Sequence, residues 1–106
     1  MLRRNWFHVL VALAAQDLHG SAIAEDVLAQ TDGELRLWPA TLYRALDELV
    51  GKGLVEELRG GDRPDGESLR KRYYRVTAEG RRAASEEARR MERMAQAAQA
   101  RIGGPA

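Results

Sequence analysis

The sequence contains no cysteine and no long apolar stretch. Without cysteine the chain can form no disulfide, thiol nucleophile or zinc–thiolate site, which fits a reducing cytosol. No apolar run is long enough to span a membrane. Residues 7–15 follow two arginines as in a signal peptide, but His8 interrupts the run and no convincing cleavage site closes it. We therefore expect a cytoplasmic protein without a membrane segment.

The chain also lacks an excess of charge of either sign. Its 17 basic and 16 acidic residues give a net charge of +1, so net charge alone offers no argument for a nucleic-acid partner. The distribution is uneven, because residues 59–75 hold six basic side chains against three acidic ones. This segment is the best candidate for contact with a polyanion.

Residues for catalysis or metal binding are scarce. The two histidines, His8 and His19, have no acidic or thiol cluster at metal-ligand spacing. Ser68 and Ser85 lack a plausible His/Asp arrangement, and no glycine-rich phosphate loop is present. We expect no enzyme activity, no metal and no cofactor.

With 106 residues, the chain is expected to form one domain. Apolar spacing predicts helices over residues 5–15, 21–31 and 39–52, with Ser21 capping the second. Pro39 suits the first position of the third helix, and Gly53 suits its C-terminal cap. Residues 34–37 form a short connector that could supply one strand of a small sheet.

Two strands, at 54–59 and 69–76, flank a loop rich in glycine and proline at 60–66. Thr77 can cap a last helix over residues 77–101. Three helices followed by a hairpin predict a mainly α winged helix-turn-helix, with the β-hairpin as the wing and a long C-terminal dimerisation helix. The expected parts are a DNA-binding domain at 1–76, a dimerisation helix at 77–102 and a disordered tail at 103–106.

The third helix is the candidate recognition helix, since such helices read base edges with their first turns. Its candidate DNA contacts are Ala40, Thr41, Tyr43 and Arg44. Alternatively, Thr41 is a local capping group and Tyr43 a half-buried core residue. The candidate contacts in the wing are Arg63, Arg70, Lys71 and Arg72. Alternatively, this hairpin is solvated and its charge is balanced by neighbouring acids.

The last helix carries small and apolar residues at alternating spacings of four and three, which predicts a helix–helix seam. The seam residues are Ala84, Ala88, Met91, Ala95, Ala98 and Ile102, with Met94 beside them, and we interpret them as a dimer interface. The alternative is a helix that packs only on its own domain. Trp6, Met91 and Met94 are candidates for an apolar ligand pocket between two subunits, because methionine adapts to varied shapes and tryptophan offers a flat face. The alternative is that these three residues are plain core or interface.

Three ordered segments carry a family resemblance: HGSAIA at 19–24, PATLYRAL at 39–46, and GLV at 53–55 followed by RYYRVTAEG at 72–80. They resemble the PadR family of bacterial transcriptional regulators, in its compact subfamily with a single C-terminal helix. The resemblance implies a homodimeric repressor, with Trp6 and Phe7 of the first helix also at the dimer interface. It further implies a small apolar or aromatic effector. Trp38 departs from the family pattern, which often has serine there.

The function predicted from the sequence is therefore a sequence-specific DNA-binding repressor. Two recognition helices in one dimer would meet successive major grooves, so the operator should be an inverted repeat. The alternative is a winged-helix module that binds other proteins and not DNA, which the near-neutral net charge permits.

Overall fold

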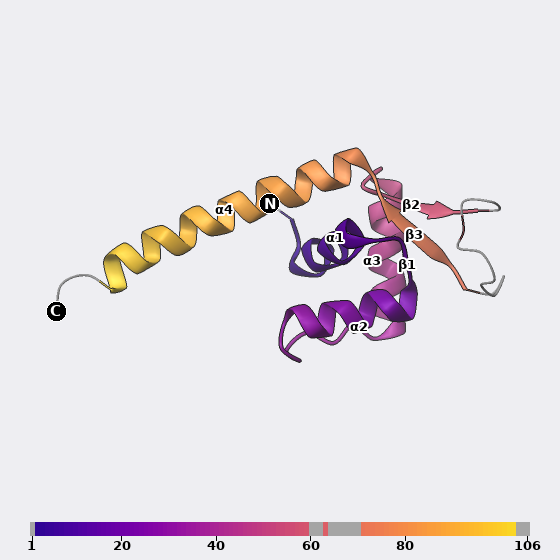
Figure 1. Cartoon of the computed structure of the whole chain (residues 1–106), viewed down its shortest axis with the longest axis horizontal. Helices are drawn as coiled ribbons and strands as arrows, with labels where there is room; N and C mark the ends of the chain where they lie inside the picture. Colours follow the sequence, from indigo (N-terminus) through magenta and orange to yellow (C-terminus); the bar gives the residue numbers. More distant parts are fainter. Residues whose placement is uncertain (1, 60–62, 64–70, 104–106) are drawn as a thin grey trace.

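A computed structural model describes residues 2–59, 63 and 71–103 of the chain. Its elements are α1 (Arg4–Ala15), β1 (Leu18–His19), α2 (Gly20–Gln30), α3 (Pro39–Gly51), β2 (Val55–Leu58), β3 (Tyr73–Val76) and α4 (Ala78–Ile102). In Figure 1, α1, α2 and α3 gather beside the small sheet, and α4 extends away from them as a long rod. The predicted winged-helix fold class is confirmed. Among the described residues, no helix is long and apolar enough to cross a membrane.

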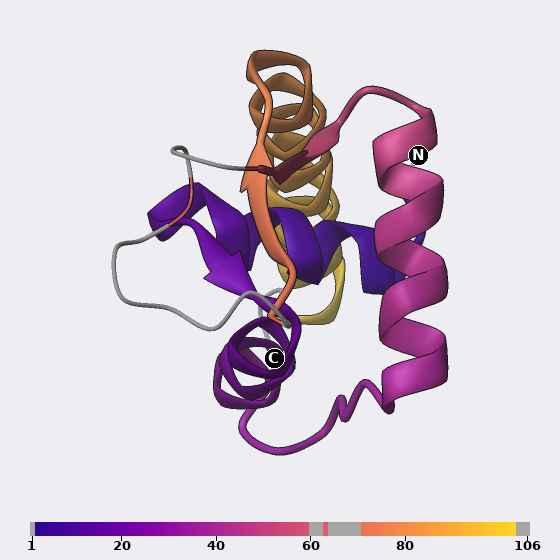
Figure 2. The ribbon, with the colours of Figure 1, turned by 90° about the vertical axis from the view of Figure 1, so that its right-hand side faces the viewer.

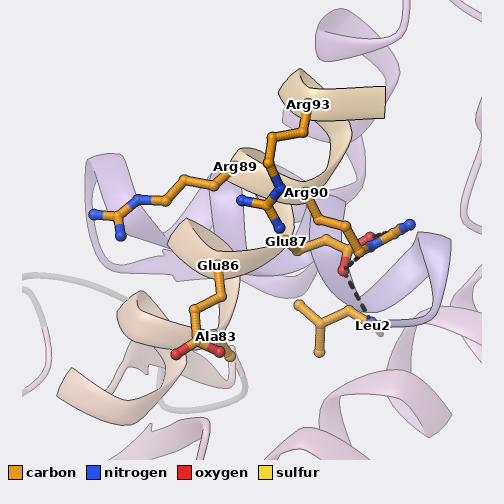
Figure 3. A pocket seen from close by; sticks show the side chains of 7 residues that line it. All are labelled: Leu2, Ala83, Glu86, Glu87, Arg89, Arg90 and Arg93. Atoms are coloured by element: carbon orange, nitrogen blue, oxygen red, sulfur yellow. Dashed lines mark hydrogen bonds and ion pairs between the residues drawn. The ribbon is translucent and has the colours of Figure 1, made fainter. Parts of the chain in front are cut away.

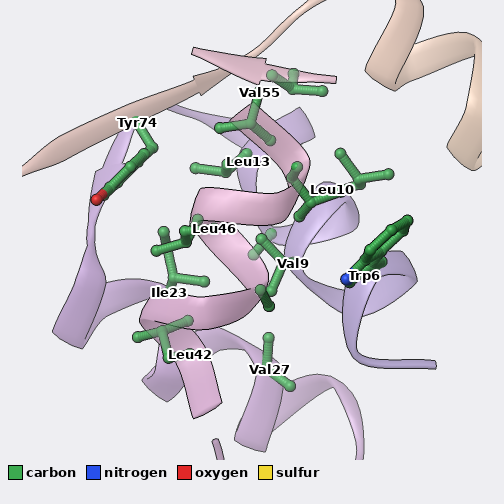
Figure 4. Close-up of a cluster of buried hydrophobic side chains, with 14 of the residues drawn as sticks. Trp6, Val9, Leu10, Leu13, Ile23, Val27, Leu42, Leu46, Val55 and Tyr74 are labelled. Carbon is green, nitrogen blue, oxygen red and sulfur yellow. The ribbon is translucent and has the colours of Figure 1, made fainter. Parts of the chain in front are cut away.

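The core lies between α1, α2, α3 and the inner face of the sheet (Figure 4). The apolar stripe of α3, made by Leu42, Leu46 and Leu49, is buried as its helical spacing predicted. Val9 and Ile23 oppose it from α1 and α2 within the same cluster. This packing fixes the rotation of α3 and thereby decides which of its side chains face outward.

The sheet has three antiparallel strands in the order β1-β3-β2. Its third strand is β1, in which Leu18 pairs with Tyr74, and the expected strand at residues 34–37 is wrong. A long-range ion pair stabilises β1 beside β3, since Arg75 donates to both carboxylate oxygens of Asp17, the shortest of the three contacts being 2.8 Å. Within the connector, the Leu35 backbone N–H donates instead to the Thr31 hydroxyl, 2.9 Å away.

The start of α2 also differs from the prediction. The helix begins at Gly20, its N-cap is His19 without a side-chain cap, and Ser21 lies inside the first turn. Gly20 is buried because the Tyr43 hydroxyl of α3 packs against it: an added Cβ would stand 2.2 Å from that oxygen. Close approach of α3 therefore requires glycine at the first position of α2.

Two predicted caps are confirmed, and they lie next to each other. Gly53 takes a φ of +74° after α3, and the N–H groups of Gly53 and Leu54 donate to Val50 and Leu49 in the pattern of a Schellman motif. The Thr77 hydroxyl accepts from the Gly80 N–H at 3.0 Å and donates to the Gly53 carbonyl at 2.7 Å. The end of α3 is thereby joined to the beginning of α4.

The hairpin is described only in part. Strand β3 begins at Tyr73, whereas the sequence predicted a strand from 69; Lys71 and Arg72 are described and are not in a strand. Residues 69 and 70 of the predicted strand lie outside the described residues. The same holds for most of the predicted loop, at 60–62 and 64–68, and for residues 104–106 of the predicted tail. In Figure 2, α2, α3 and the strands β2 and β3 face the viewer, with α4 behind them.

Candidate nucleic-acid interface

The first turns of α3 present one exposed face opposite the buried stripe. Ala40, Arg44 and Asp47 share this face at helical spacings of four and three, and all three are exposed. Thr41 is exposed beside them. Arg44 makes no hydrogen bond or ion pair with another residue of the described chain. This face therefore carries a positive side chain that is available to a partner.

Tyr43 is only half-buried, and its hydroxyl points at the backbone of α2 at Gly20. The ring is packed between α2 and the Arg72 guanidinium, whose central carbon lies 5.5 Å from the ring centre. This placement agrees with the alternative interpretation of Tyr43 as a half-buried core residue. Contact of its hydroxyl with phosphate stays a prediction.

A hollow of about 350 Å³ separates the beginning of α1 from α3. Arg4 lines it together with Thr41 and Arg44, and Arg4 also makes no hydrogen bond or ion pair to other described residues. Arg3, on the same rim, is paired with Glu48 at 3.0 Å. Sequence reasoning missed Arg4, because only the packing of α1 on α3 brings the chain's fourth residue beside its forty-fourth.

The basic residues of the wing are more engaged than their sequence suggests. Arg63 donates through Nη2 to the Lys71 carbonyl at 2.5 Å, and its guanidinium lies 5.5 Å from the Tyr73 ring. Arg70 lies outside the described residues. Arg72 donates to Glu57, and this hydrogen bond raises the pKa of the Arg72 guanidinium against the opposing effect of burial. Arg72 is thus held by its own chain, in contrast to Arg44.

Trp38, where the family pattern often has serine, stands at the N-cap of α3 with 65% of its surface exposed and makes no side-chain cap. Its ring lies 5.3 Å from the Arg36 guanidinium carbon. Together with Leu28, Leu42 and Tyr43, it lines an apolar hollow of about 250 Å³ between α2 and α3. Because an indole accepts no hydrogen bond, the first N–H groups of α3 point outward without a side-chain partner.

At residue 38, serine is therefore expected to stabilise the fold relative to alanine. The backbone at this position, with φ −71° and ψ 153°, already has N-cap geometry, and serine would supply the missing acceptor. We expect the unfolding free energy of the Trp38→Ser variant to be about 1 kcal/mol higher than that of the Trp38→Ala variant. In thermal denaturation this corresponds to a difference of roughly 4–8 °C. Equal melting temperatures for the two variants would show that the helix gains nothing from a cap here.

The beginning of α4 packs on α1, and the rest of the helix extends past it. Ala84 packs against the core, whereas every residue from Met91 to Gly103 is exposed. Ile102 and Met94 are among the most exposed apolar side chains, at 82% and 57%. Among the predicted seam residues, only Ala84 is partly covered by the chain's own body; Ala88 is exposed, and the other four lie on the open half of α4, residues 91–102.

Trp6 occupies a different place from the predicted seam. It is buried in the core of its own chain, beneath the guanidinium of Arg3 at 4.9 Å, so little of its ring is left for a partner; Phe7 is half-buried. The hollow that Trp6 lines does not include Met91 or Met94. Within one chain, the structure does not bring the three candidate pocket residues together.

Another hollow, of about 500 Å³, lies between the N-terminal segment and α4 (Figure 3). Glu87 lies in it at 7% exposure, accepting from the Leu2 backbone N–H at 3.3 Å and from the Arg90 guanidinium. The hydrogen bond from Arg90, chiefly, lowers the pKa of the Glu87 carboxyl below its usual value. Arg89 and Arg93 line the exposed side of the same hollow.

A model of the Transcriptional regulator PadR-like family matches residues 9–86, which is most of the chain. This chain belongs to the PadR-like family. It is accordingly a member of a family of transcriptional regulators and not an enzyme. The match covers the winged-helix body and the first turns of α4. Among curated proteins, none matches this sequence.

Solved structures share the PadR-like fold. A transcriptional regulator from Clostridium thermocellum is 23% identical, with a TM-score of 0.75 over 92% of this chain and 89% of its own. A PadR family regulator from Clostridium difficile is 22% identical, with a TM-score of 0.71 over 96% and 100%. The PcaV transcriptional regulator from Streptomyces coelicolor is 26% identical, with a TM-score of 0.74 over 93% and 64%.

Proposed function

We propose that this PadR-like regulator is a homodimeric repressor that binds an inverted-repeat operator with α3 as its recognition helix. The observation that carries this proposal is the exposed face of α3, where Arg44 has no partner in the described chain. Arginine can bond the acceptor edge of guanine or a phosphate, and Thr41 can bond either. Ala40 leaves room for close approach and can touch a thymine methyl.

Positive charge beside α3 supports the same proposal. Arg4 lies across the hollow from Arg44 and adds a second uncommitted cation. In the wing, we propose that Arg63, Arg70 and Lys71 include contacts to flanking phosphates or the minor groove. These groups would position the protein on the duplex, while α3 would read the sequence.

The open half of α4 is the proposed dimer contact, because it exposes Met91, Met94 and Ile102 along one helix. A dimer would place two recognition helices about one turn of DNA apart, ~34 Å. An effector that changed the angle between the α4 helices would alter this spacing and weaken binding. PcaV has been solved in complex with its natural ligand, which supports an effector site in this fold. Our candidate effector site is a pocket between subunits beside Met91 and Met94; Trp6, the third residue predicted for it, is buried in the core of its own chain.

Arg44→Ala tests the recognition helix. We expect the affinity for DNA from the gene's own upstream region to fall about 10- to 100-fold, since a lost arginine–guanine contact costs about 1–3 kcal/mol. Fluorescence anisotropy over a range of salt concentrations measures the affinity and its salt slope, and circular dichroism verifies the fold.

The matched control is Arg82→Ala, which removes an exposed arginine of α4 that has no partner in the described chain. It should bind DNA as the unmodified protein does. If Arg44→Ala and Arg82→Ala have equal affinities, α3 is not the recognition helix. If the unmodified protein forms no specific complex even at low salt, the repressor proposal fails and a protein-binding module becomes the better description.

A further inference from the structure

Arg72 stands where three elements of the DNA-reading half meet. Its Nη2 donates to Glu57 Oε1 of β2 at 2.8 Å, and its Nε donates to the same oxygen at 3.2 Å. The same Nη2 lies 3.5 Å from Asp47 Oδ1 of α3. One guanidinium therefore connects the wing strand β2 to the recognition helix.

Two aromatic rings complete this site. The guanidinium carbon of Arg72 lies 5.5 Å from the ring centre of Tyr43 on α3 and 5.5 Å from that of Tyr74 on β3. Both rings are anchored beyond Arg72, since Tyr74 is fully buried and pairs with Leu18 of β1, while the Tyr43 hydroxyl packs on Gly20. The planar cation thus bridges two rings and two carboxylates that come from three elements, α3, β2 and β3.

We propose that Arg72 is a positioning residue that fixes the wing against α3, so that both engage one stretch of DNA together. This inference rests on the proposed function and assigns Arg72 a role other than the DNA contact expected from its sequence. Only arginine has the geometry for it, because lysine offers neither the planar fork nor the stacking surface. Each exposed ion pair alone would stabilise little, but the shared geometry restricts the hairpin relative to the helix.

The Glu57→Met variant distinguishes positioning from direct DNA contact, because the two roles of Arg72 predict opposite changes in DNA affinity. This variant removes a negative charge from the wing and frees the Arg72 guanidinium from its closest partner. If Arg72 contacted phosphate, both changes would tighten DNA binding. If Arg72 positions the wing, affinity falls instead, and we expect a loss of roughly five- to tenfold, within the range of coupled contacts.

Arg72→Met and the double variant complete a cycle, with Arg72→Lys as a milder change that keeps the charge. We expect Arg72→Met to weaken DNA binding without changing the salt slope, and the double variant to bind no worse than Arg72→Met alone. Loss of a phosphate contact would lower the slope by about 1. Tighter binding by Glu57→Met, or a lower slope in Arg72→Met, overturns the proposal.

Amide hydrogen exchange of the free protein gives a readout that does not depend on DNA. Loss of Arg72 or of the Glu57 carboxylate should speed exchange in the paired residues of β2 and β3, such as Leu58 and Tyr73, while core amides such as Leu46 stay protected. Unchanged exchange in β2 and β3 overturns the positioning role even if the protein binds its operator. Faster exchange in a protein that binds no operator would reject the repressor function and keep the link between wing and helix.

Discussion

Gly80→Ala is expected to destabilise the fold by about 3 kcal/mol or more. A Cβ at residue 80 would lie 2.0 Å from the Leu54 carbonyl oxygen and 2.8 Å from Val76 Cγ2. The Leu54 carbonyl cannot shift without a cost in free energy, because it accepts a hydrogen bond from the Thr77 backbone N–H at 3.1 Å. Leu54 also directly precedes strand β2, which limits how far its backbone can move. Thermal denaturation should show the melting temperature lowered by more than about 10 °C.

Gly51→Ala is the matched control for this prediction. Gly51 is also a helical glycine, but nothing lies within 4 Å of the position that its Cβ would take. Alanine there should be neutral or should stabilise the protein by up to about 1 kcal/mol, because it restricts the unfolded chain. If both variants melt at the same temperature, the close approach of α4 to Leu54 is not what requires glycine at 80.

Local signals made much of this fold predictable. Pro39 and the stripe of Leu42, Leu46 and Leu49 predict α3 because helix initiation and burial depend on neighbours within a few residues. Thr77 likewise predicts the start of α4, since an N-cap is satisfied by a backbone N–H three residues later. Such features are visible in sequence because their causes are adjacent in sequence.

The features that were missed depend on residues far apart in the chain. Strand β1 has only two residues and no apolar alternation, and it pairs with β3, whose Arg75 reaches Asp17 across 58 positions. At the start of α2, Tyr43 of another helix approaches Gly20 so closely that no side chain fits there, and Ser21 lies inside the first turn instead of capping it. Neither contact leaves a periodic signal in a single sequence.

The same distinction applies to the candidate interface. A charge count marks Arg72 and Arg75 as members of a basic segment, but the fold pairs them with Glu57 of β2 and with Asp17, which directly precedes β1. Arg44 looks no different in sequence, yet it has no such partner in the described chain. Composition locates positive charge, whereas only the packing of the elements determines which cations are available to a partner.

Met91→Glu combined with Met94→Glu is expected to convert the proposed dimer into monomers. Ala84 and Glu87, on the same side of α4, are covered by the chain's own body, whereas Met91 and Met94 continue that side at 38% and 57% exposure. In a symmetric dimer the double substitution would bury four carboxylates without partners, at a cost of several kcal/mol each. Light scattering should then give the monomer mass.

Gln96→Glu combined with Ala100→Glu adds the same charge to the opposite side of the same exposed helical segment. That variant should remain dimeric, so a general effect of acidic residues on α4 is controlled. Loss of the dimer should also weaken operator binding by about 10²–10⁴-fold, because the two recognition helices no longer bind as one linked unit. If the variant with glutamate at Met91 and Met94 stays dimeric, the interface lies elsewhere. If it is a monomer that binds the operator with full affinity, one α3 helix suffices for recognition.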